Sequence, residues 1–164
     1  MLGQHFKTAR YELYIIASPW AYRYRYLVQP RLERGGPESS VPLAHTIQEW
    51  DDIFAESASA IDICAFQDGQ IHYNELPEFH EGIKRLGDDH GVTIWSNVES
   101  FDRDMPIKFP PANWPNLRLK LAEASKVAEK IITFEFAHFM SPNSCYPAAH
   151  KLFERYSDFI DTNA

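Results

Sequence analysis

Two glutamates close apolar runs of this sequence and are the residues best suited to acid–base or nucleophilic chemistry. Glu99 directly follows residues 92–98 (VTIWSNV), and Glu135 lies between two phenylalanines in residues 130–136 (KIITFEF). Unpaired carboxylates are almost never fully buried, so we favour a functional role for both over a structural ion pair with a nearby Arg or Lys. Two carboxylates at neighbouring strand ends could divide the acid and base roles of glycoside hydrolysis, and their separation would distinguish retention from inversion.

Other polar residues gather at the predicted strand ends and in the loops that follow. The residues expected to bind a substrate are Gln67, Asp68, Asn97, His138 and Asn143, with Trp20 as an aromatic surface for a sugar ring. Each has a plainer alternative. Asp68 before Gly69 is typical of a turn, His138 could be a hydrogen-bonded loop residue, and Asn143 could cap the last helix.

Alternation along a strand predicts which side chains share a face. Asn97 and Glu99 share one face of residues 92–98, and Thr133 and Glu135 share one face of residues 130–136. The residues expected to bury against helices are Ile132, Phe134 and Phe136. We therefore expect both glutamates on one functional face of the sheet.

Runs rich in β-branched and aromatic residues indicate the elements that must position these side chains. The predicted strands are residues 11–18, 61–67, 92–98 and 130–136, and the predicted helices are residues 42–57, 74–90, 115–129 and a last helix from Pro147. A βαβαβαβα order implies an α/β fold with a parallel sheet and chemistry at the C-terminal ends of the strands. Four βα units are half of a (β/α)8 TIM barrel, which typically needs roughly 250 residues. We expect one partial-barrel domain over residues 1–164.

Composition excludes several classes of function. A net charge of −7 over 164 residues argues against a nucleic-acid partner and against a polybasic membrane surface. The sequence has neither an apolar run long enough for a membrane span nor an N-terminal signal peptide, so we expect a soluble cytoplasmic chain. Cys64 and Cys145 lack metal-ligand spacing and are expected to be plain thiols.

Three segments carry a resemblance to a known family. They are residues 65–69 (AFQDG), 91–101 (GVTIWSNVESF) and 130–143 (KIITFEFAHFMSPN). Together they resemble a domain-of-unknown-function family of TIM-barrel proteins that is regarded as glycoside-hydrolase-like, over about Tyr14 to Tyr156. The resemblance implies that this chain corresponds to strands five to eight of such a barrel. Glu99 would then end strand seven, where the large clan of retaining hydrolases carries its nucleophile, while the acid/base residue of strand four would lie outside this chain.

The resulting hypothesis is a glycoside hydrolase acting on an oligosaccharide or glycoside without a cofactor or a metal. Glu99 would be the nucleophile, and Glu135 a second essential carboxylate that positions the substrate or tunes Glu99. The resemblance also implies that relatives are often secreted. Because a half-barrel leaves two open sheet edges, the expected partner is a second copy of the chain or a separate N-terminal half-barrel.

Three alternatives remain open from the sequence. A metal-dependent barrel hydrolase or isomerase would use Asp68, Glu99, Glu135 and His138, because carboxylates and imidazole suit a divalent ion. A carbohydrate-binding module would bind sugar without turnover. A truncated product would have no function of its own.

Overall fold

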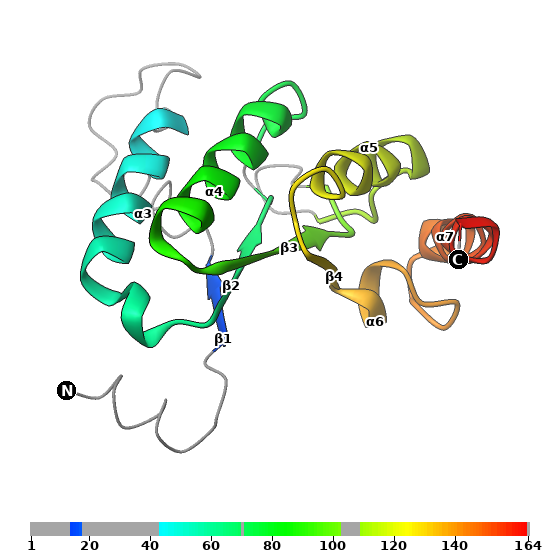
Figure 1. Ribbon diagram of the computed structural model, residues 1–164. Coiled ribbons are helices and arrows are strands. Elements are labelled where there is room, and N and C mark those ends of the chain that lie inside the picture. Colours follow the sequence, from blue (N-terminus) through cyan, green and yellow to red (C-terminus); the bar gives the residue numbers. More distant parts are fainter. Residues whose placement is uncertain (1–13, 18–42, 70, 103–108, 164) are drawn as a thin grey trace, which may run out of the picture.

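The computed structural model describes residues 14–17, 43–69, 71–102 and 109–163 (Figure 1). The strands are β1 (Tyr14–Ala17), β2 (Ile63–Gln67), β3 (Thr93–Glu99) and β4 (Lys130–Phe134). The helices are α3 (Leu43–Ser57), the 3-10 turn η1 (Ala58–Ala60), α4 (Leu76–His90), α5 (Trp114–Ala124), α6 (Phe136–Phe139) and α7 (Pro147–Asn163). Only part of the predicted first strand falls within these residues, and Trp20 lies outside them.

The four strands form one parallel sheet in the order β1-β2-β3-β4. The prediction of an α/β fold with a parallel sheet is therefore confirmed. β2 reads ICAFQ and is buried along almost its whole length, which is the pattern of a strand covered on both faces. The helices α3, α4 and α5 each return the chain to the start of the next parallel strand, so the C-terminal ends of β2, β3 and β4 lie at one edge of the sheet.

One apolar cluster joins α3 and α4 to the sheet. Phe66 of β2 makes edge-to-face contacts with Trp50 of α3 and Phe79 of α4, with ring centroids 5.1 and 6.4 Å away. Phe54, Phe66 and Phe79 are at most 1% exposed, and burying one such ring contributes about 1.5–3 kcal/mol. Aromatic packing in this cluster fixes the helical layer on that face of β2 and β3.

A second apolar cluster packs α5 and α7 over β3 and β4. Its buried members are Val98, Ala112, Leu117, Leu121, Ala124, Met140 and Leu152. Val98 and Ile94 have the same parity in β3, so α4 and α5 cover the same face of the sheet (Figure 1). The opposite face carries Trp95, Asn97 and Glu99.

The register of β4 overturns the predicted assignment of its faces. Asn97 pairs with Ile132 and Glu99 with Phe134, so Ile132 and Phe134, rather than Thr133, share the face of Glu99. Phe134 is 44% exposed and Phe136 is 46% exposed, so the prediction that they bury against helices is wrong. Alternation separates two faces but does not tell which one meets the helices; the neighbouring strand decides that.

Some boundaries also differ from the prediction. β4 ends at Phe134, and the residues that follow form the short helix α6 instead of continuing the strand. α5 ends at Ala124, five residues before its predicted end. Among the described residues, no helix combines the length and apolar character needed to cross a bilayer.

Candidate functional site

Four of the predicted site residues meet where β2 and β3 end. Gln67 closes β2 and pairs in register with Asn97 of β3. Asp68 directly follows Gln67, and Glu99 lies two residues beyond Asn97. Asp68 and Glu99 are 1% exposed and Asn97 is 3% exposed. The structure thus brings these polar groups together in a setting that water barely reaches.

Side chains bind both polar groups of the Glu99 backbone. The Glu99 N–H donates to Asp68 Oδ1 at 2.9 Å, and Lys120 Nζ donates to the Glu99 carbonyl oxygen at 3.3 Å. Lys120 Nζ also lies 3.5 Å from Asp68 Oδ1, in an ion pair whose side chains are 5% and 0% exposed. An ion pair this deeply buried needs both partners, because either charge alone would be costly to desolvate.

Gly69 explains where the Glu99 carboxylate lies. A Cβ atom built on Gly69 would stand 2.1 Å from both Glu99 carboxylate oxygens, so the carboxylate occupies the space that any side chain at position 69 would need. Any side chain at position 69 would therefore force the Glu99 carboxylate to move. Asp68 therefore binds the Glu99 backbone, and the neighbouring Gly69 leaves room for the Glu99 carboxylate.

A cavity of about 240 Å³ opens at Gly69, the residue against which this carboxylate lies, although Glu99 itself does not line it. Its walls are Gly69, Ile71, His72, Tyr73, Phe101, Asp102 and Lys120. The Tyr73 hydroxyl donates a hydrogen bond to Asp102, and Lys120 Nζ lies 5.9 Å from the centre of the Tyr73 ring. Burial, and then the hydrogen bond to Asp102 and its charge, raise the pKa of Tyr73 well above its ordinary value, so the phenol stays neutral.

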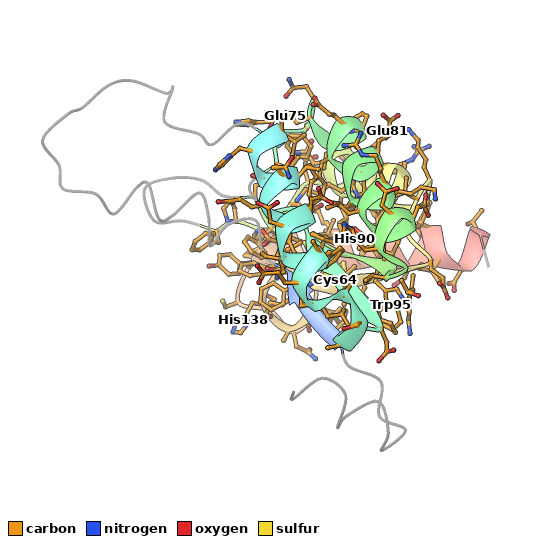
Figure 2. The ribbon with its side chains drawn as sticks, turned by 60° about the vertical axis from the view of Figure 1, so that its left-hand side comes forward. Cys64, Glu75, Glu81, His90, Trp95 and His138 are labelled. Carbon is orange, nitrogen blue, oxygen red and sulfur yellow. The ribbon has the colours of Figure 1, made fainter. Side chains whose placement is uncertain are left out.

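Glu135 is differently placed from Glu99. It caps the N-terminus of α6 by accepting the His138 N–H at 2.9 Å, and its carboxylate lies 2.7 Å from His138 Nδ1. Figure 2 labels His138. Ser100, next to Glu99, donates its hydroxyl to the Glu135 carbonyl at 2.9 Å. The two glutamate backbones are therefore close, but the Glu135 carboxylate is engaged with an exposed histidine.

The pKa of Glu135 reflects this arrangement. Burial is the largest single influence and raises the pKa, but the hydrogen bonds from the His138 backbone and ring and the histidine charge together outweigh it and hold the pKa below its ordinary value. Glu135 is therefore ionised at neutral pH. It suits the stabilisation of positive charge better than proton donation.

Asn143, the remaining predicted binding residue, lies in an exposed turn. Its N–H donates to Ser141 Oγ at 3.1 Å, and α7 begins only at Pro147, so Asn143 does not cap that helix. Within the described segments, no three His, Cys, Asp or Glu side chains are grouped to hold a metal ion. Burial raises the pKa of Cys64 to about 12, which is consistent with a plain thiol.

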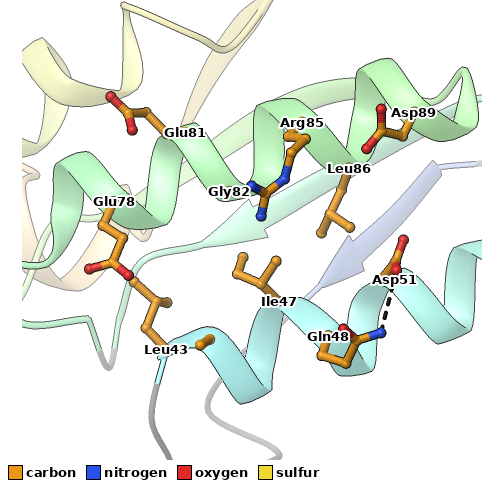
Figure 3. Close-up of a pocket in the computed structure, with 11 residues that line it drawn as sticks. Leu43, Ile47, Gln48, Asp51, Glu78, Glu81, Gly82, Arg85, Leu86 and Asp89 are labelled. Atoms are coloured by element: carbon orange, nitrogen blue, oxygen red, sulfur yellow. Dashed lines mark hydrogen bonds between the residues drawn. The ribbon is translucent and has the colours of Figure 1, made fainter.

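A larger cavity, of about 520 Å³, lies between α3 and α4 (Figure 3). It is lined by residues of these two helices, among them Arg85 and the acidic residues Asp51, Glu78 and Glu81. None of the strand-end residues contributes to it. We therefore place the candidate site at the smaller cavity, whose walls include Gly69 and Lys120, the two residues that lie against Glu99.

Sequence patterns did not lead to Lys120 or Asp102, whereas Tyr73 and Phe101 were expected among the aromatic residues of the rim loops. Lys120 carried a usable signal, because it falls in the apolar stripe of α5 with Leu117 and Leu121. A lysine at such a position is expected to have a buried anionic partner. Asp102 carried none, since only the fold brings its loop to that of Tyr73.

Comparison with known proteins adds two matches. The sequence profile of a family described as "Domain of unknown function (DUF4434)" matches residues 1–146. The chain is also similar to a solved structure from Bacteroides thetaiotaomicron VPI-5482, described as a "putative alpha-L-fucosidase", with 38% identity and a TM-score of 0.76. That match covers 92% of this chain and 44% of the other, so this chain spans less than half the length of that relative. No curated protein matches the chain.

Proposed function

The chain belongs to the DUF4434 family, and we propose that it forms the C-terminal half of a (β/α)8 barrel and carries part of a glycoside hydrolase site. Four parallel strands in chain order, with helices over one face, support the half-barrel. Similarity to less than half of a longer protein described as a putative fucosidase supports it as well. The polar groups lie at the C-terminal strand ends, where barrel enzymes hold their substrates.

The observation that carries this proposal is the placement of Glu99. Its carboxylate is enclosed against Gly69 beside a cavity of about 240 Å³, and its backbone is bound on both sides. Sites that enclose a drug-sized ligand span about 300–1,000 Å³, so this cavity suits one sugar unit. The aromatic wall and the Asp102 carboxylate offer an apolar surface and hydroxyl acceptors for it.

In this proposal Glu99 is the nucleophile and Glu135 stabilises the positive charge of the transition state. Because Glu135 is held ionised, the proton donor would come from outside the four described strands. An N-terminal half-barrel, or a second copy of this chain, would supply it. Such a partner would also cover Phe134 and Phe136, which are exposed on and beyond the open strand β4.

Hydrolysis of aryl glycosides, starting with an α-L-fucoside, tests the proposal. We expect Glu99→Gln and Glu135→Gln each to lower turnover by at least about 100-fold, the scale expected when a positioned catalytic group is lost. Glu154→Gln, an exposed substitution in α7 with the same loss of charge, is the control. Unchanged turnover in both test variants would contradict the assignment.

A carbohydrate-binding module is the second candidate. It is favoured by one observation, which is that Glu99 is only 1% exposed. Calorimetry separates the two functions. Sugar binding without turnover supports the carbohydrate-binding module. Turnover that depends on Glu99 supports the hydrolase. A chain that neither binds nor hydrolyses sugar would contradict both functions.

A further inference from the structure

Lys120 is an unusual residue for its position in the fold. It lies in the core-facing stripe of α5 beside Leu117 and Leu121, and it is 4% exposed. Burying an ammonium group there is costly, and an apolar residue of similar size would pack without that cost. The charge at this position is therefore expected to serve a specific contact.

The Lys120 charge lies next to Glu99, at the point where β2 has ended and no longer pairs with β3. β2 ends at Gln67, which pairs with Asn97, so no β2 residue stands opposite Glu99. On the other side, the Ser100 N–H donates to the Phe134 carbonyl at 2.6 Å, so the N–H of Ser100 points toward β4. Successive residues of a strand direct their backbone groups to opposite neighbours. The Glu99 peptide groups therefore face the β2 side beyond the end of that strand.

Asp68 and Lys120 supply the missing partners. Asp68 Oδ1 accepts the Glu99 N–H at 2.9 Å, and Lys120 Nζ binds the Glu99 carbonyl at 3.3 Å. The two side chains are also joined to each other at 3.5 Å. The three residues thus form a closed set of contacts that fixes both ends of the Glu99 backbone unit.

We infer that Asp68 and Lys120 are positioning residues that aim the Glu99 carboxylate at the Gly69 wall of the cavity. Because the backbone is held on both sides of the Glu99 Cα, the direction of its Cα–Cβ bond is fixed. Gly69, which has no side chain, provides the space for the carboxylate. Neither residue needs to touch the substrate. An effect of Asp68 and Lys120 on turnover rests on the proposed function. Their ordering of the Glu99 backbone does not depend on it.

Amide hydrogen exchange measured by NMR tests the positioning directly. In the wild-type chain the Glu99 amide should be protected, because its N–H is bound to a buried carboxylate. In Asp68→Ala it should exchange at least about tenfold faster, while the amides of Trp95 and Ser96 in the middle of β3 keep their protection. Lys126→Met removes the same charge from an exposed site and should leave the Glu99 amide unchanged.

A second variant covers the case in which Asp68→Ala does not fold. Asp68→Leu combined with Lys120→Met removes both buried charges together with the acceptor of the Glu99 N–H, so no uncompensated charge remains. It should fold and still show faster exchange at Glu99 than at the reference amides. Exchange at Glu99 that matches the wild type in the folded variant would overturn the inference.

Turnover provides an independent readout. If the wild-type chain hydrolyses a glycoside, Asp68→Ala should lose kcat with little change in KM, because it misaligns Glu99 and Asp68 is not one of the cavity walls that hold the sugar. An unchanged kcat would overturn the catalytic part of the inference. If the wild-type chain shows no turnover, the proposed function fails, and the exchange experiment still decides whether Asp68 and Lys120 position Glu99.

Discussion

Gly69→Ala should damage this protein because of one contact, with the Glu99 carboxylate. The added Cβ atom would stand 2.1 Å from both carboxylate oxygens, far inside van der Waals contact, so the carboxylate must move. Overpacking of this kind costs about 1–3 kcal/mol. At about 2–4 °C per kcal/mol for a chain of this size, the melting temperature should fall by about 2–12 °C.

A double-mutant cycle isolates this contact. In a Glu99→Ala background the clash is gone, so Gly69→Ala should cost less by at least about 1 kcal/mol than it does in the wild type. In a Glu99→Gln background the side chain keeps its shape, and the cost should remain. Chemical denaturation of the variants gives the free energies. An equal cost of Gly69→Ala in all three backgrounds would refute the placement of the Glu99 carboxylate against Gly69.

Three further predictions follow from buried or paired groups. Lys120→Met should destabilise the fold by about 3–5 kcal/mol, because it leaves Asp68 buried without its cation, and adding Asp68→Asn should recover part of that loss in denaturant unfolding. The pKa of Glu135 is lower in the folded chain than its ordinary value of 4.5. The ionised carboxylate therefore stabilises the fold above that value, and this stabilisation is lost as pH falls through the folded pKa. Between about pH 6 and pH 3 the melting temperature should fall less in Glu135→Gln than in the wild type. Cys145 is exposed and Cys64 is buried with a pKa of about 12, so a thiol reagent should label Cys145 in the native chain and Cys64 only after unfolding; rapid labelling of both would contradict the burial of β2.

The strands and the order of elements could be predicted because their signals are local. Apolar runs bounded by turn residues placed three strands within two residues of their observed limits at each end. The Asp68-Gly69 turn and the polar ends of β2 and β3 were visible for the same reason. Four parallel strands then bring those ends to one edge of the sheet.

The side chains of β4 show what local patterns leave out. Ile132, Phe134 and Phe136 look like a core-facing stripe, yet the register with β3 puts Phe134 beside Glu99 on the open face. Only the pairing with a neighbouring strand sets this choice. The pairing of Lys120 with Asp68, 52 residues apart, likewise depends on how α5 packs on the sheet.

Sugar binding at the strand ends is the central claim, and amide chemical shifts measured during titration with fucose and a panel of oligosaccharides test it most directly. The account predicts that one sugar shifts the amides of Gly69, Tyr73 and Phe101 around the cavity, and that the shifts weaken when Asp102 is replaced by Ala. Saturating sugar that moves none of these amides, or that moves only amides of α3 and α4 around the larger cavity, would contradict it.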